Sequence, residues 1–168
     1  MTIAEFDHLG TEQKKTLLQQ CCGSRSWVEK MLTIPPVDDL VDLLEDAEEK
    51  WYECTEADWK EAFAHHPKIG DIHSLKEKFS STSQWAEGEQ SSVKVASEQV
   101  LQSLVEGNKL YKEKFGYIFI VSATGKSAEE MLGILTARLH NSPEDEIQNA
   151  MEEQLKITRL RLEKLFES

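Results

Sequence analysis

The run YIFIVSA, residues 117–123, is the one stretch of this chain that has the composition of a buried β-strand. Its β-branched and aromatic residues suit a sheet, but periodicity cannot separate a short buried strand from a buried extended connection. A strand also needs a partner, because its backbone N–H and C=O groups must find hydrogen bonds. No second run of this kind occurs, so we expect a buried extended segment near 117–123 whose backbone groups bond to neighbouring elements or to a ligand.

Helical patterns dominate the rest of the sequence. Apolar residues recur at helical spacing in each segment, as Leu40, Leu44, Ala47 and Trp51 do within 37–54. The expected helices cover about 11–22, 26–32, 37–54, 55–65, 71–79, 87–115, 127–141 and 142 to nearly the last residue. We therefore predict an all-α fold, a bundle of roughly seven to nine helices.

Several of these boundaries carry capping signals. Thr11 is the expected cap of the first helix, and Thr55 with Asp58 resembles a capping box. Ser142 followed by Pro143 marks the start of the last helix, because proline is favoured at the first helical position. Gly116 is a natural stop for the long helix before it.

The motif EAFAHHPKIGD, residues 61–71, joins one such helix to a proline. Proline disfavours the α conformation in the residue before it, so a helix should stop at His66. The partial negative charge of a helix C-terminus favours imidazolium, which would make His66 a proton donor or an anion contact near neutral pH. Two alternatives stay open: His65 and His66 could simply bond the last helical carbonyls, or they could join Asp71 and His73 in a metal site.

Two other places carry residues suited to binding an anion. Glu89 and Gln90 stand at the start of the long helix, where backbone N–H groups are unpaired, although an acidic residue there is also ordinary. Arg161 shares a helical face with Ile157 and Leu165, whereas Arg159 does not. An arginine on an apolar stripe either extends its head group to solvent or clamps a buried carboxylate.

Charge and cysteine content limit the class of protein. With 19 Lys and Arg against 31 Asp and Glu, the net charge is −12, which opposes binding to nucleic acid or anionic membranes. The three cysteines have no metal-ligand spacing and suit a reducing compartment. The first residues lack a signal-peptide pattern. We expect one cytoplasmic domain over residues 1–168.

Taken together, four motifs resemble the 2-oxo-4-hydroxy-4-carboxy-5-ureidoimidazoline (OHCU) decarboxylases of urate degradation. These are HPKIGD at 66–71, EQ at 89–90, FGYIFIVSATGKS at 115–127 and ITRLRLEKL at 157–165. The resemblance implies an all-α domain, a decarboxylation of OHCU to (S)-allantoin that needs no metal or cofactor, and a homodimer.

The resemblance also assigns residues to the site. It implies that His66, Glu89 and Arg161 are catalytic. The residues that it implies contact the substrate are Pro67, Glu87, Gly88, Gln90, Ile120, Val121, Ser122 and Ala123. The chain departs from the family at Ala86, where a serine is usual, so a hydroxyl contact to the substrate is missing or replaced. The competing interpretations are an acidic helical interaction module without enzymatic activity and a helix-rich metallohydrolase.

Overall fold

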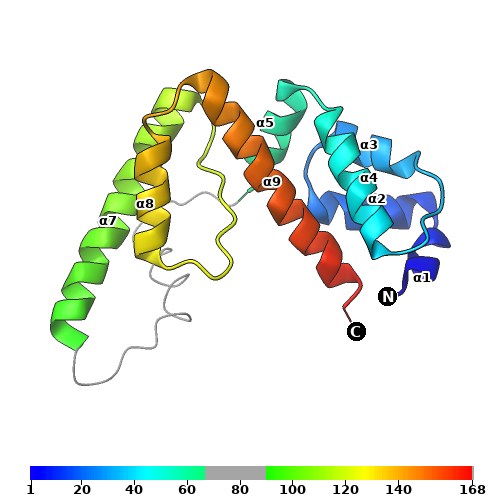
Figure 1. The fold of residues 1–168 in the computed structure, drawn as a ribbon, viewed down its shortest axis with the longest axis horizontal. Coiled ribbons are helices and arrows are strands. Elements are labelled where there is room, and N and C mark those ends of the chain that lie inside the picture. Colours follow the sequence, from blue (N-terminus) through cyan, green and yellow to red (C-terminus); the bar gives the residue numbers. More distant parts are fainter. Residues whose placement is uncertain (67–89, 168) are drawn as a thin grey trace. The chain divides into compact units, whose positions relative to one another are not determined.

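A computed structural model of the chain describes residues 1–66 and 90–167, with only the backbone of 90–97. The described residues form eight α-helices and no strand, so the all-α prediction is confirmed (Figure 1). The predicted helix over 71–79 lies outside the described residues. The helices are α1 (Ile3–Asp7), α2 (Thr11–Cys21), α3 (Arg25–Leu32), α4 (Leu40–Tyr52), α5 (Glu56–Ala64), α7 (Gln90–Phe115), α8 (Ala128–Arg138) and α9 (Pro143–Leu165).

Contacts divide the chain into two compact units. The first unit comprises Met1–His66, Ile120–Ser122 and Ile147–Ser168, and the second comprises Pro67–Phe119 and Ala123–Glu146. The first unit therefore contains α1 to α5 and most of α9, whereas the second contains α7 and α8.

The core of the first unit forms where α3 packs against α2, α4 and α5. Its largest buried side chains include Trp27, Trp51 and Phe63. A buried indole N–H needs an acceptor, and both tryptophans have one: Trp27 Nε1 donates to Ala47 O at 3.0 Å and Trp51 Nε1 to Met151 O at 2.8 Å. These bonds fix α3 to α4, and α4 to α9.

Helix starts follow side-chain caps, and two expectations need correction. Thr55 and Asp58 exchange hydrogen bonds as the predicted capping box. The expected Thr11 cap is wrong by one residue, because Gly10 occupies the N-cap and Gln13 Oε1 accepts from its N–H at 3.2 Å. The short helix α1 was not expected, although Thr2 and Glu5 form a second capping box there.

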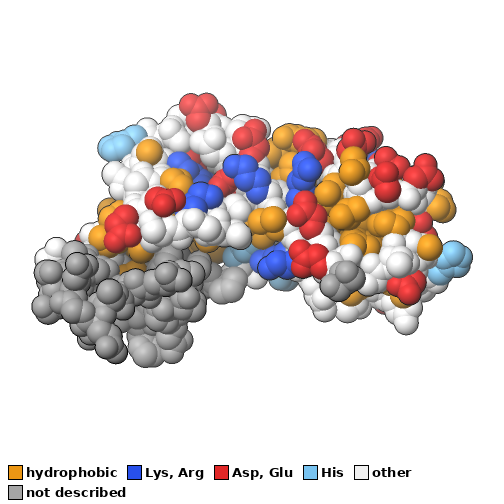
Figure 2. Space-filling model, turned by 60° about the horizontal axis from the view of Figure 1, so that its bottom comes forward, with side chains coloured by type: hydrophobic (Ala, Val, Ile, Leu, Met, Phe, Trp, Pro, Cys, Tyr) orange, Lys and Arg blue, Asp and Glu red, His pale blue; other side chains and the backbone are white. Residues whose placement is uncertain are grey.

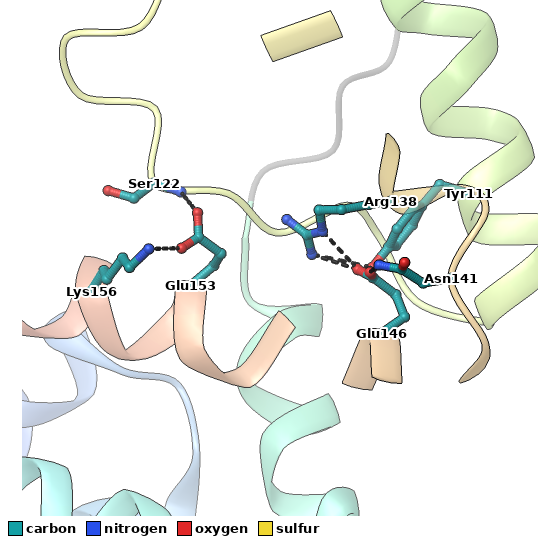
Figure 3. A network of polar contacts seen from close by, with 7 residues as sticks. All are labelled: Tyr111, Ser122, Arg138, Asn141, Glu146, Glu153 and Lys156. Atoms are coloured by element: carbon teal, nitrogen blue, oxygen red, sulfur yellow. Dashed lines mark hydrogen bonds and ion pairs between the residues drawn. The ribbon is translucent and has the colours of Figure 1, made fainter. Parts of the chain in front are cut away.

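In the second unit α7 packs along α8 (Figure 1). Gly107 permits this close approach, since a Cβ built at Gly107 would lie 2.6 Å from Leu135 Cδ2. A buried ion pair completes the unit: Arg138 Nη2 lies 2.6 Å from Glu146 Oε2, and both side chains are almost fully buried. Tyr111 and Asn141 donate to the same carboxylate (Figure 3).

The segment after α7 is neither helix nor strand. Residues 118–123 have no regular structure, while Tyr117, Phe119, Ile120 and Ser122 are buried. The prediction of a buried extended segment near 117–123 is therefore confirmed. In the second unit the Arg138 guanidinium carbon lies 4.6 Å from the centroid of the Phe119 ring, a cation–π contact that holds the start of the segment.

Acidic residues are spread over the surface. Figure 2 shows them among basic and hydrophobic side chains on the face that it draws, as expected for solvated helix faces. Within the described part of the chain, no helix is both long and apolar enough to cross a membrane.

Candidate active site

Helix α5 places His66 at the edge of the first unit's core. The helix ends at Ala64, His65 is its C-cap, and the His66 N–H still donates to Phe63 O at 3.2 Å. The helix therefore stops where the His-Pro sequence predicts.

Two carboxylates tie α5 to the start of α3. Glu61 accepts from the Arg25 backbone N–H at 2.6 Å, and Ser26 Oγ donates to Asp58 at 2.9 Å. Hydrogen bonds lower the pKa of both carboxyls: that of Glu61 chiefly through the Arg25 N–H, and that of Asp58 chiefly through the Thr55 N–H of the capping box. The helix that carries His66 is thus fixed at several points along its length.

The His66 ring bonds to a side chain of α9. Its Nε2 lies against Oε1 of Gln154, and Gln154 Nε2 donates to Thr158 Oγ1 at 3.1 Å. Gln154 is 0% exposed and Thr158 is 2% exposed. The histidine therefore does not bond the last carbonyls of its own helix through its ring, which was the simplest alternative.

The structure corrects the expectation that the His66 ring is an imidazolium near neutral pH. Burial lowers the pKa of His66 from its ordinary 6.5, and the positive charge of Arg161 lowers it further, while the Gln154 bond acts the other way. Desolvation of the ring outweighs the helix terminus, because burial penalises the charged form. His66 is therefore neutral near pH 7 and can accept a proton.

Arg161 lies on the same face of α9. Its Nη1 donates to the carbonyl oxygen of Cys21, the last residue of α2, at 3.3 Å. A helix C-terminus is a natural place for a cation. Within the described part of the chain Arg161 has no carboxylate partner, whereas the neighbouring Arg159 pairs with Glu48 at 3.3 Å. The partly buried Arg161 guanidinium keeps donors for an anion.

The buried segment is attached to α9 by Glu153. Its Oε1 accepts from the Ser122 backbone N–H at 3.2 Å, and its other oxygen pairs with Lys156 at 2.5 Å (Figure 3). Ile120 and Ser122 are buried and Val121 is partly buried. Because the Ser122 N–H is already bonded, a ligand contact by this residue would use another of its groups.

Most of the remaining predicted site residues lie outside the part of the chain that the structure describes. Pro67, Glu87, Gly88 and Glu89 lie outside the described residues, as does Ala86. Gln90 is the first residue of α7, described only by its backbone, and Ala123 is a partly buried residue of the second unit.

Sequence reasoning missed Gln154, Thr158 and Glu153. A signal for the first two was present: positions 154, 158 and 161 follow helical spacing on one face, between the buried Met151 and Leu162. Three polar residues inside an apolar stripe indicate a buried polar network.

Metal ligands were the other alternative for this motif. Among residues 1–66 and 90–167, no three His, Cys, Asp or Glu side chains are grouped so that they could hold a metal ion. Asp71 and His73, which that alternative required, lie outside these ranges.

Comparisons with known proteins agree on one family. The sequence model of OHCU decarboxylase matches residues 7–163. The uric acid degradation bifunctional protein TTL of Arabidopsis thaliana is 37% identical over 147 residues, which are 87% of this chain and 45% of that protein. The 2-oxo-4-hydroxy-4-carboxy-5-ureidoimidazoline decarboxylase of Amia calva is 43% identical over 60 residues, which are 36% of this chain and 34% of that one.

One solved structure supports the same family, and another shares the fold. An OHCU decarboxylase crystallised in the presence of (S)-allantoin superposes with a TM-score of 0.72 and 36% identity, covering 89% of this chain and 96% of that one. A structure of (S)-allantoin synthase shares the fold, with a TM-score of 0.71 and 16% identity, over 98% of this chain and 54% of that one. This chain spans less than half the length of the curated relatives that it matches. The match over residues 7–163 shows that the chain belongs to the OHCU decarboxylase family.

Proposed function

We propose that this chain decarboxylates OHCU to (S)-allantoin in urate degradation, as one catalytic domain over residues 1–168 and without a metal or cofactor. Family membership supports the reaction. The single observation from the site that supports it best is Arg161, a partly buried cation without a carboxylate partner among the described residues, beside a histidine whose pKa is lowered.

The substrate's own chemistry explains why a cofactor is unnecessary. Its carboxylate sits on a carbon beside an imine, so the electron pair left by departing carbon dioxide flows into the ring as far as the imine nitrogen, which takes up a proton. The resulting enol loses its hydroxyl proton and gains a proton at the carbon that bears the ureido group. Starting from the carboxylate, the reaction consumes one proton overall. The protein must fix the pose, stabilise the developing charge and protonate one face.

The residue roles follow from these needs. Arg161 holds an anionic or carbonyl oxygen of the substrate, because a guanidinium offers several directed donors. His66, neutral near pH 7, accepts the hydroxyl proton and returns it to carbon. Glu89 binds the hydroxyl or ureido group. The other substrate contacts are assigned to Pro67, Glu87, Gly88, Gln90, Ile120, Val121, Ser122 and Ala123.

The test compares two arginines on the same helix. Arg161→Gln removes the proposed anion contact, whereas Arg159→Gln removes an exposed partner of Glu48. With freshly prepared OHCU, Arg161→Gln should lower kcat/KM at least about a hundredfold, the scale of losing one charge-stabilising donor. Arg159→Gln should leave it within a factor of about two. Equal rates for the two variants would contradict the assignment of Arg161.

The metal-free part of the proposal has its own test. Dialysis against a chelator should leave turnover unchanged, and loss of activity that Zn²⁺ restores would favour the metallohydrolase instead.

We further propose that the chain acts in the cytoplasm as a homodimer. The buried, unpaired Cys21, Cys22 and Cys54 support a reducing compartment. The homodimer is supported by the family resemblance, and light scattering of the purified protein tests it.

A further inference from the structure

The buried amide of Gln154 is the polar group of α9 that touches the ring of His66. A fully buried amide is costly unless its donors and acceptor are partnered. Gln154 meets this need with two partners from different places: the His66 ring at the end of α5 and the Thr158 hydroxyl one turn further along α9. Apolar residues at 151, 155 and 162 surround the pair on this face.

The direction of these bonds determines which ring nitrogen of His66 is basic. Because the amide nitrogen of Gln154 donates to Thr158, its oxygen faces His66 and accepts from Nε2–H. The neutral ring then carries its proton on Nε2, and its lone pair is on Nδ1. Thr158 Oγ1 accepts this bond, and the same side chain also bonds to Cys22. Burial raises the pKa of Cys22 to about 12, and the Thr158 hydroxyl opposes this.

We propose that Gln154 is a positioning residue that fixes the tautomer and orientation of His66, so that Nδ1 is the nitrogen that exchanges a proton with the substrate. The role of Nδ1 rests on the proposed function; the state of the ring does not. The charged or titratable groups that face His66 from the described elements are Arg161 on α9 and His65 at the C-cap of α5, and both disfavour imidazolium. Gln154 alone among these contacts favours it.

The substitutions that test this keep the size of the side chain. Gln154→Glu places a carboxylate against Nε2 and should raise the titration midpoint of His66 by about one unit or more. Gln154→Met removes the acceptor and should lower the midpoint by roughly half a unit to one unit. Gln148→Glu, an exposed glutamine on the same helix, is the matched control and should not move it.

The measurement is ¹⁵N NMR of histidine-labelled protein, with the His66 signals assigned by His66→Gln. The wild-type ring should show a protonated Nε2 and an unprotonated Nδ1 at pH 8. Thr158→Val, which lets the amide rotate, should weaken the Nε2–H signal, and Thr158→Ser should restore it. Circular dichroism confirms that each variant is folded.

Activity separates the two proposals. In Gln154→Glu the acid limb of the kcat profile should shift by as much as the NMR midpoint of His66. Two results would overturn the positioning role even if the enzyme is active. One is a proton on Nδ1 of His66 in the wild type. The other is a titration midpoint of His66 within about 0.2 unit of wild type in both folded Gln154 variants. If the NMR midpoints shift as predicted but the protein does not turn over OHCU, the proposed function is overturned and the positioning role stands.

Discussion

Gly23 is a steric requirement at the base of the candidate site. It lies between α2 and α3, and a Cβ built there would lie 2.5 Å from Cγ, 2.6 Å from Cδ2 and 2.7 Å from Cβ of His65. Rotation of the imidazole relieves the first two contacts but not the third, because Cβ is fixed to the backbone. Gly23→Ala therefore forces the end of α5 to move by about 0.7 Å, from 2.7 Å to an ordinary contact at 3.4 Å.

The cost of this movement follows from packing. An added methyl group in a close-packed site costs about 1–3 kcal/mol of unfolding free energy. In a chain of this length that corresponds to a fall in Tm of roughly 2–12 °C. Because His65 precedes His66, kcat/KM for OHCU should fall as well. Gly23 is not in the left-handed region, so the cost is steric only.

Two further variants control the experiment. A Cβ at the exposed Gly133 in α8 meets nothing within 4 Å, so Gly133→Ala should stabilise the protein by up to about 1 kcal/mol through helix propensity. In a His65→Gly background the clash disappears, and Gly23→Ala should cost far less than in the wild type. Urea unfolding measures the unfolding free energy of Gly23→Ala, Gly133→Ala, His65→Gly and the double variant at 23 and 65, each relative to wild type. A Gly23→Ala variant as stable as wild type, or additive effects at 23 and 65, would refute the steric argument.

Three further perturbations test the energetics of the described units. Thr55→Ala removes the cap of α5 and should cost about 1 kcal/mol in urea unfolding; no loss would mean that the cap is not needed. Glu146→Gln leaves the Arg138 charge buried without the Glu146 carboxylate, and it should cost about 3–5 kcal/mol of unfolding free energy. Its control, Glu48→Gln at the exposed pair with Arg159, should cost less than about 1 kcal/mol. Similar losses of stability in the two variants would contradict the contrast in burial. Because the folded-state pKa of His66 lies below 6.5, its contribution to stability is complete above pH 6.5 and is lost as pH falls through the folded pKa. Urea midpoints should therefore fall less steeply below pH 6.5 for His66→Gln than for wild type, and parallel curves would contradict the lowered pKa.

Local rules predicted most of the fold. Capping residues and apolar spacing located α4, α5 and α9 to within a few residues, because these signals act over one or two turns of the chain. The shift from Thr11 to Gly10 reflects the same locality, since either residue can precede the first turn and Gln13 decides between them. The unpaired run at 117–123 was predictable because a lone strand has no partner.

The chemistry of the site was harder to predict, because it depends on contacts between distant segments. A helix terminus favours imidazolium at His66, whereas burial of the ring and the charges of Arg161 and His65 lower its pKa. Likewise, the role of Glu153 appears only when the Ser122 N–H is seen to need an acceptor 31 residues away. Position on an apolar stripe identified Arg161 but could not show that the carbonyl of Cys21 holds it.

The chirality of the product tests the central claim most directly, because OHCU also decays without a catalyst. Fresh OHCU is incubated with the purified chain and the optical activity of the allantoin is followed by circular dichroism. Decarboxylation by this chain predicts a large excess of (S)-allantoin that disappears in Arg161→Gln. A racemic product at the uncatalysed rate would contradict the account.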